Sequence, residues 1–198
     1  MFSLIFILEI IGTVAFAISG ASIAIKKGMD IFGIAVLGTT TAVGGGIIRD
    51  LILGINPPLA FKNPLYAIVA IIVSLLVFST KSYIEISEDN IVVLLMDDIG
   101  LGIFTVVGVK AGIPYNNLFL SVFVGVLTGV GGGVLRDLFA GNIPFIFSKH
   151  FYACASIIGA IASCLIWRFN PDISMIFGAI IVIILRIFAV KYNWNLPR

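Results

Sequence analysis

Two stretches of the chain carry the same glycine-rich motif. Residues 41–54 read TAVGGGIIRDLILG, and residues 128–141 read TGVGGGVLRDLFAG. Nine of these fourteen positions are identical, and Pro57 matches Pro144 at the same offset of 87 residues. Agreement over this length predicts that one structural unit occurs twice in the chain.

The repeat extends upstream of the motif. The segment Glu9-x-x-Gly12, followed by Phe16 and Gly20, recurs as Asp97-x-x-Gly100, followed by Phe104 and Gly108. The matched positions together cover about residues 8–70 and 96–157. Most of the chain is therefore predicted to consist of two related halves.

The composition excludes a soluble domain. Of the 198 residues, 60% are hydrophobic and only 11% are charged, and the mean hydropathy is +1.19. A soluble domain of this size has too much surface to hide that many apolar side chains, whereas a bilayer removes the need to hide them. The net charge of +2 and the scattered basic residues do not indicate a nucleic-acid partner. Membrane lipid is the expected surrounding.

Seven apolar segments lie between polar loops, and each is close to the length of about 20 residues that spans a hydrocarbon core. They are residues 3–25, 31–53, 64–80, 90–109, 117–139, 151–168 and 173–190. Inside lipid every backbone amide must be hydrogen-bonded within the chain, so the segments are predicted to be helices. The fold class is therefore an all-α integral membrane protein with seven transmembrane helices.

Three predicted helices separate each motif from its copy. An odd number inverts the second half relative to the first, which predicts two inverted three-helix repeats and a seventh helix that packs on the bundle. The predicted units are residues 1–85, 86–170 and 171–198, the last being the seventh helix and a tail. In membrane proteins of this kind the functional path lies between the halves near the midplane.

Lysine and arginine positions predict the orientation in a cell membrane. One side receives Lys26, Lys27, Lys81, Lys149, Arg186, Lys191 and Arg198, and the other receives Lys62, Lys110 and Arg168. Because basic residues concentrate on the cytoplasmic side, the C-terminus is predicted to be cytoplasmic and the N-terminus outside.

The consecutive glycines are expected to weaken their helices, because each glycine costs about 1 kcal/mol of helix propensity relative to alanine. They are Gly44, Gly45, Gly46, Gly131, Gly132 and Gly133. Two breaks at these positions would expose polar backbone along a common central path. The alternative is that the glycines only let helices pack closely.

An Arg-Asp pair follows each glycine run, as Arg49-Asp50 and Arg136-Asp137. An arginine in a membrane helix is costly unless it is paired or wetted. Either these pairs line or gate a pore, or the arginines lie at the interface and reach the headgroups.

The predicted topology groups the acidic residues with these arginines. Glu9 and Arg49 are placed towards the outer face, and Asp97 or Asp98 is placed with Arg136 towards the cytoplasmic face. We therefore expect one acid–arginine pair at each mouth of a path. Asp97 and Asp98 lie about 10 Å into their segment, where carboxylates are functional or are buried against a basic partner.

Two threonines precede the glycine runs at equivalent positions, Thr41 and Thr128. Their hydroxyl groups would offer oxygen to an ion or a water molecule, or would bond the carbonyl four residues back in their own helix. The sequence contains no cluster of the Ser/His/Asp, Cys/His or metal-ligand type. An enzyme is therefore not expected, and neither a cofactor nor a metal site is predicted.

The doubled GGG-x-x-Arg-Asp motif resembles that of the prokaryotic members of the trimeric intracellular cation (TRIC) channel family, which is also grouped as a two-copy glycine transporter domain family. The resemblance covers nearly the whole chain. It implies a homotrimer in which each protomer has a pore flanked by the broken second and fifth helices. It also implies passage of monovalent cations, chiefly potassium, with Arg49, Asp50, Arg136 and Asp137 beside the path.

Three functions remain open at the level of sequence. The first is a passive cation channel, and the second is a small-solute transporter, for example of glycine or another small amino acid. Inverted repeats with broken helices suit both, because helix N-termini after the glycines would hold a carboxylate. The third is an accessory membrane subunit. The animal channels of the family carry a Lys-Glu-Val element that is not found here, which puts regulation by anionic lipid in doubt.

Overall fold

The computed structural model describes residues 3–80, 91–148 and 151–194, and within these ranges every regular element is helical. The long helices are α1 (Leu4–Lys26), α2 (Ile31–Ile52), α4 (Leu65–Thr80), α5 (Ile91–Gly112), α6 (Leu118–Phe139), α8 (Tyr152–Ile166) and α9 (Pro171–Lys191). Two single-turn helices, α3 (Leu59–Lys62) and α7 (Phe145–Ser148), precede α4 and α8, and the 3-10 turn η1 (Ile113–Tyr115) follows α5.

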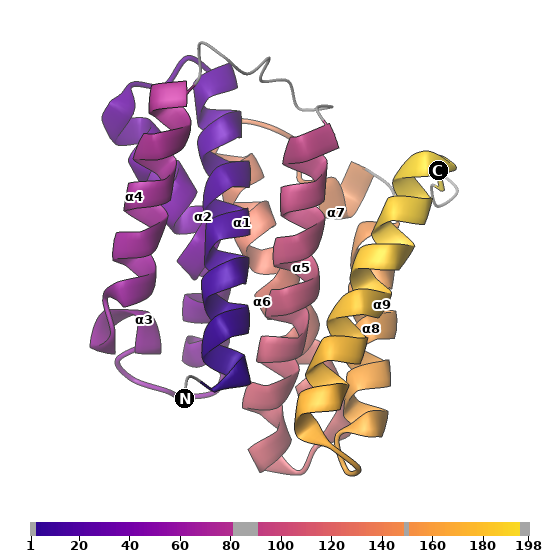
Figure 1. Ribbon diagram of the computed structural model, residues 1–198. Helices are drawn as coiled ribbons and strands as arrows, with labels where there is room; N and C mark the ends of the chain where they lie inside the picture. The colour runs from indigo at the N-terminus through magenta and orange to yellow at the C-terminus, as the bar shows by residue number, and fades with distance from the viewer. Residues whose placement is uncertain (1–2, 81–90, 149–150, 195–198) are drawn as a thin grey trace.

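The helices form two groups. Figure 1 shows α1, α2 and α4 on one side and α5, α6 and α8 on the other, with α9 at the outer edge beside α8. The groups meet where α1 packs on α5 and where α2 packs on α6, and α9 packs on α5 and α8. In the same view α1 and α5 lie side by side and run in opposite directions (Figure 1).

The seven long helices fall on the seven apolar segments predicted from the sequence. Five of them are long and apolar enough to cross a membrane, whereas α4 and α8 are shorter apolar helices. With 16 and 15 residues, they extend about 24 and 22 Å, less than the hydrocarbon thickness of about 30 Å. The sequence did not predict α3 and α7, which occupy the chain just before these two short helices.

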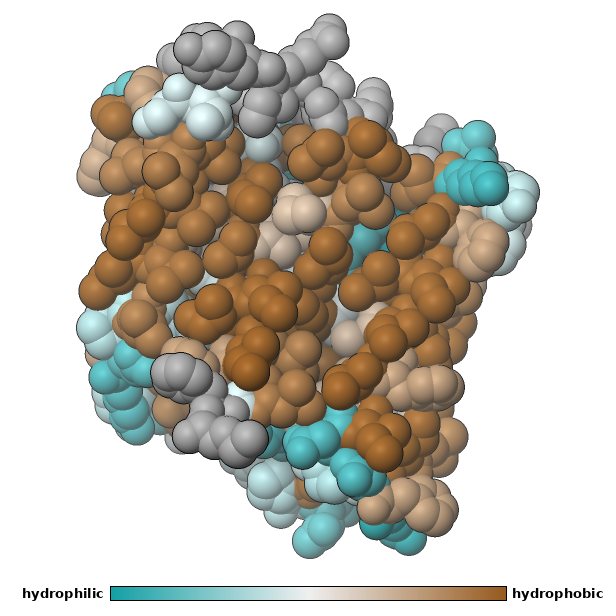
Figure 2. Space-filling view, viewed as in Figure 1, coloured by the Kyte–Doolittle hydropathy of each residue, from teal (hydrophilic) through white to brown (hydrophobic). Residues whose placement is uncertain are grey.

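The molecule is apolar on the outside and holds charge inside. Figure 2 shows brown, hydrophobic residues across the middle of the visible face, with teal, hydrophilic residues gathered towards its upper and lower ends. By contrast, seven charged residues are buried among the described ranges: Arg49, Asp50, Asp97, Asp98, Arg136, Asp137 and Arg186. This distribution suits lipid as the solvent and makes the protein an all-helical membrane protein.

The glycine runs lie at the closest approach of α2 and α6. A Cβ added to Gly45 would overlap the carbonyl oxygen of Thr128, and a Cβ added to Gly132 would overlap the carbonyl oxygen of Thr41. Each run lies inside one continuous helix. The predicted break in the two helices is therefore wrong, because the missing side chains serve backbone-to-backbone packing while helical hydrogen bonding continues.

A second contact between the groups is also reciprocal. Phe16 and Phe104 stack with ring centres 5.3 Å apart, and each ring lies on a glycine of the other group. A Cβ on Gly100 would overlap the Phe16 ring, and a Cβ on Gly12 would come within 3.0 Å of the Phe104 ring. The small residues and the rings therefore form one interlocked layer between α1 and α5.

The last glycine of each motif ends its helix. Gly54 and Gly141 have φ values of +72° and +69°, a left-handed conformation that glycine adopts without a Cβ penalty. The amide of the residue after each glycine donates to the carbonyl of Asp50 or Asp137 at 2.8 Å. This pairing is the Schellman arrangement, and it turns the chain back towards α3 and α7.

The helix α9 carries one residue that the sequence reasoning misplaced. Arg186 was counted among the basic residues flanking the membrane, but it lies within α9 and is 1% exposed. That use of Arg186 was wrong, because the side chain is held inside the bundle by an acidic partner. Of the other basic residues used for orientation, Lys81, Lys149 and Arg198 lie outside the described ranges.

We predict that Gly45→Ala and Gly132→Ala each destabilise the protein by about 1–3 kcal/mol, the usual cost of overpacking, because the new methyl group meets a backbone carbonyl that cannot move aside. Thermal unfolding in detergent measures the effect. Gly46→Ala is the matched control, since its Cβ would lie 3.9 Å from the nearest atom, Nη2 of Arg49. Equal loss of stability in all three variants would refute packing as the role of Gly45 and Gly132.

Candidate functional site

The first polar cluster comprises Glu9 on α1, Arg49 and Asp50 on α2, and Tyr66 on α4. Nε and Nη2 of Arg49 donate to Oδ1 of Asp50 at 2.9 and 2.7 Å. The Tyr66 hydroxyl donates to Oε2 of Glu9. Four charged or phenolic groups are thus brought together from three helices of the first group.

These residues line a cavity of about 240 Å³. Its wall also includes Thr13, Gly46, Lys62, Asn63 and Phe104. Phe104 comes from α5 of the other group, so the cavity reaches the contact between the two groups. It carries charges of both signs, because the carboxylate of Glu9 and the basic groups of Arg49 and Lys62 share one space.

The second polar cluster comprises Ser19 on α1, Asp97 on α5, Arg136 and Asp137 on α6, and Tyr152 on α8. Nη1 of Arg136 pairs with Oδ1 of Asp97 and donates to the Ser19 hydroxyl at 2.6 Å. Nε of Arg136 donates to Oδ1 of Asp137 at 2.8 Å. Arg136 is 1% exposed, so its guanidinium is enclosed by partners from three helices.

Three polar atoms of the second cluster are buried without a hydrogen-bond partner among the described residues. They are Oδ2 of Asp97, Nη2 of Arg136 and the hydroxyl of Tyr152. All three belong to residues that surround the bare Cα of Gly133, where a Cβ would lie 3.0 Å from the Tyr152 hydroxyl and 3.7 Å from Nη2 of Arg136. Orphaned donors and acceptors in one place suit a bound water molecule or a passing hydrated ion.

The aspartate of each motif has the same second bond. Oδ2 of Asp50 accepts from the Leu59 amide at 2.8 Å, and Oδ2 of Asp137 accepts from the Phe145 amide at 3.0 Å. Leu59 and Phe145 are the first residues of α3 and α7. Each aspartate therefore joins its arginine to the start of a short helix, and it fixes the turn that returns the chain to the bundle.

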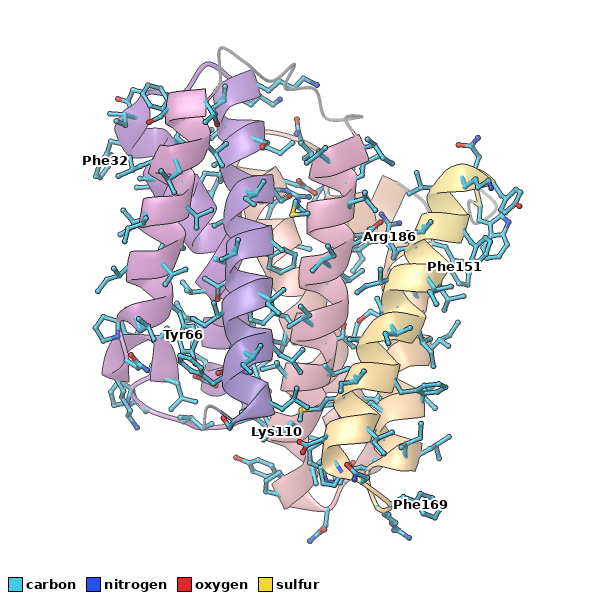
Figure 3. All side chains as sticks on the ribbon, viewed as in Figure 1. Phe32, Tyr66, Lys110, Phe151, Phe169 and Arg186 are labelled. Carbon is cyan, nitrogen blue, oxygen red and sulfur yellow. The ribbon has the colours of Figure 1, made fainter. Side chains whose placement is uncertain are left out.

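A further ion pair adjoins the second polar cluster. Nε of Arg186 on α9 donates to Oδ1 of Asp98 at 2.6 Å, and the arginine lies over the Tyr152 ring, 4.8 Å from its centre. Figure 3 shows Arg186 between α9 and α5 near the upper end of the view, and Tyr66 of the first cluster near the lower end. The two polar clusters thus lie towards opposite ends of the helices.

The predicted acid–arginine pairs are formed in one half. Asp97 pairs with Arg136 as expected, but Arg49 pairs with Asp50 and Glu9 bonds to Tyr66. Glu9 and Arg49 nevertheless line the same cavity. The Thr41 and Thr128 hydroxyls bond the carbonyls of Leu37 and Val124, four residues back in their own helices.

Four residues of the two clusters and the adjoining ion pair were missed as site residues. Tyr66 and Tyr152 lie in the first two residues of the third helix of each half, but they are 86 residues apart, one residue out of register with the repeat, so the repeat did not pair them. Arg186 stands alone in an apolar segment, and an intramembrane arginine is a functional candidate by default. Ser19 has Val107 at its matching position, so the repeat gave no signal for it.

A protein-family model described as "Glycine transporter" matches the chain twice, over residues 6–82 and 94–168. A relative in Escherichia coli (strain K12), the UPF0126 inner membrane protein YadS, is 37% identical, with 98% of this chain and 95% of the relative covered. Both findings extend over the two polar clusters.

Solved structures of TRIC channels have the same fold. A structure described in terms of conductance through TRIC cation channels is 42% identical with a TM-score of 0.87, covering 97% of this chain and 95% of that chain. The trimeric intracellular cation channel orthologue from Rhodobacter sphaeroides is 30% identical with a TM-score of 0.88, covering 98% and 100%. The doubled motif, the helical fold and similarity along the whole chain show that this protein belongs to the TRIC-type family whose model is described as "Glycine transporter".

Proposed function

We propose that the protein is a cation channel that passes monovalent ions, chiefly potassium, through each protomer. The observation that carries the proposal is the line of buried charge inside an apolar bundle, with one polar cluster towards each end of the helices. Charge of this kind is expensive in a membrane and marks ion pathways. The similarity to solved TRIC cation channels supports the same function.

The path in this proposal runs between the groups, past the α2–α6 crossing. Gly46 borders the cavity of the first polar cluster, and Gly133 borders the three orphaned polar atoms of the second. The bare Cα at each position leaves room beside a charged group. The walls at the two ends of this path are formed by the Arg-Asp pairs of the two motifs, Arg49-Asp50 and Arg136-Asp137. The negative charge that favours cations comes from Glu9, Asp97 and Asp98.

We further propose that the two groups are inverted repeats of three membrane-crossing helices, with α9 as the seventh. Reciprocal contacts support a two-fold relation between them, because Gly45 meets Thr128 just as Gly132 meets Thr41. Short third helices occur at corresponding positions of the two halves, and such pairs point to the functional path. The units 1–85, 86–170 and 171–198 and a cytoplasmic C-terminus remain part of this proposal.

A second candidate is transport of a small zwitterion such as glycine. The cavity of the first polar cluster favours it, because Glu9 would hold an ammonium group while Arg49 or Lys62 would hold a carboxylate. A volume of about 240 Å³ is enough for a small amino acid. The channel and the transporter differ in whether flux follows the electrochemical gradient alone or saturates with one substrate.

We predict that the purified protein in liposomes carries potassium current with unitary steps, and that added glycine leaves the current unchanged. The readouts are flux down a potassium gradient and single-channel recording. Saturable glycine uptake without potassium current would replace the channel with the transporter. An accessory subunit would show neither activity when purified alone.

We predict that Glu9→Gln lowers potassium conductance about threefold, because it removes a negative charge from the cavity while keeping the side-chain shape. Asp172→Asn is the matched control, since it removes an exposed carboxylate at the start of α9, away from both clusters. Single-channel recordings of both variants measure the effect. An unchanged conductance in Glu9→Gln would remove the first polar cluster from the path.

We propose a homotrimer, on the similarity to the trimeric orthologue from Rhodobacter sphaeroides. We predict that the detergent-solubilised protein has the mass of three chains of 21.2 kDa each, measured by native mass spectrometry or by light scattering with correction for detergent. A protein that conducts potassium as a monomer would contradict the proposed assembly and would leave the pore within each protomer intact.

A further inference from the structure

The helix α9 lies outside both segments matched by the family model, the second of which ends at residue 168. It nevertheless sends one charged side chain into the bundle. Arg186 is 1% exposed, and its Nε donates to Oδ1 of Asp98 at 2.6 Å. An ion pair therefore joins α9 to the region of the second polar cluster. The sequence predicted only that this helix packs on the bundle.

Asp98 has no acidic equivalent in the first half. The match between Glu9 and Asp97 places Ile10 opposite Asp98. The second half thus contains one additional acid, and α9 supplies one additional base to meet it. The neighbouring Asp97 faces Arg136 instead, so α5 stands between two arginines that come from different helices.

The additional pair adds no net charge to the second end. Among the described residues, the first polar cluster holds two carboxylates, those of Glu9 and Asp50, and one guanidinium, and the Lys62 ammonium borders the same cavity. The second cluster with its adjoining pair holds three carboxylates and two guanidiniums. The second end therefore has a formal net charge of −1 when every group is ionised, whereas the first end has none once Lys62 is counted. Without Arg186 the second end would have −2, and without Asp98 it would have none.

Arg186 also supports the aromatic wall of the second cluster. Its guanidinium lies 4.8 Å from the centre of the Tyr152 ring, and Phe145 packs edge-on to the same ring at 6.3 Å. Arg136 in turn lies over Phe145, 5.0 Å from its ring centre. The Tyr152 hydroxyl is thereby held beside Gly133, together with the orphaned atoms of Asp97 and Arg136.

We propose that Arg186 is a positioning residue of the ion path, which sets the charge at the second end by cancelling Asp98 and holds Tyr152 against the path. The inference rests on the proposed cation-channel function. It gives α9 a part in ion selection, because the net charge beside a hydrated path decides how strongly cations are favoured over anions.

The test is the permeability ratio of potassium to chloride, taken from the reversal potential of the reconstituted full chain across a potassium chloride gradient. Asp98→Asn removes the net negative charge, and Arg186→Gln doubles it. A unit charge about 6 Å from a hydrated ion changes the ion's occupancy about threefold. We expect the ratio to fall about threefold in Asp98→Asn and to rise about threefold in Arg186→Gln.

Two further variants separate charge from structure. Asp98→Asn/Arg186→Gln restores the net charge of −1, and Arg186→Lys keeps it while replacing the planar guanidinium. We expect both to give a permeability ratio close to the wild-type value. Unfolding temperatures of all variants are measured in parallel. If the role of Arg186 were purely structural, the variants would lower the unfolding temperature and leave the permeability ratio unchanged.

The outcomes are distinct. If wild-type protein carries potassium current and all four variants keep its permeability ratio, the inference is overturned and the channel function stands. If the ratio in the double variant differs from the wild-type value by as much as in either single variant, charge balance is overturned as the cause. If wild-type protein carries no current, the channel function and the inference fail together. Should one single variant fail to fold, the other still decides the matter, because the inference predicts a shifted permeability ratio in each of them.

Discussion

The contact between the backbones of α2 and α6 is the constraint on which the rest of the structure depends. Glycine at positions 45 and 132 lets each helix reach a threonine carbonyl of the other. The same two helices end in an Arg-Asp pair and a left-handed glycine. Close packing of α2 and α6 therefore fixes where four charged side chains lie, and the aspartates then fix where α3 and α7 begin.

The buried charges are held in pairs, and each pair depends on both partners. Replacing a buried ion pair by apolar residues is often neutral or stabilising, whereas removing one partner costs about 3–5 kcal/mol. Arg136 has two carboxylate partners, Asp97 and Asp137, yet its Nη2 and Oδ2 of Asp97 have no hydrogen-bond partner among the described residues. A water molecule or an ion at this position would find both a donor and an acceptor in these two atoms.

The sequence was sufficient to predict the helices, because an apolar segment in lipid must form a helix to satisfy its backbone amides. The length of each such segment can be read from the sequence. The sequence also placed Asp97 or Asp98 with Arg136 at one end of the bundle, and the structure shows the pair with Asp97. It failed where a partner has no counterpart in the other half, as with Ser19, or lies outside the repeat, as with Arg186. The sequence left two roles open for the glycines, because propensity measured in water predicts a weakened helix, whereas inside a packed bundle the absence of a side chain lets another helix approach, as at Gly45 and Gly132.

The two polar clusters differ in how the carboxylate of the first helix in each half is satisfied. Glu9 is bonded by a tyrosine, and a cavity remains beside it. Asp97 is bonded by an arginine and a serine, and the corresponding tyrosine is left without a partner among the described residues. Since the two halves share one motif, the difference must come from residues that do not repeat. Ser19, Asp98 and Arg186 are such residues, and all three lie in or beside the second polar cluster.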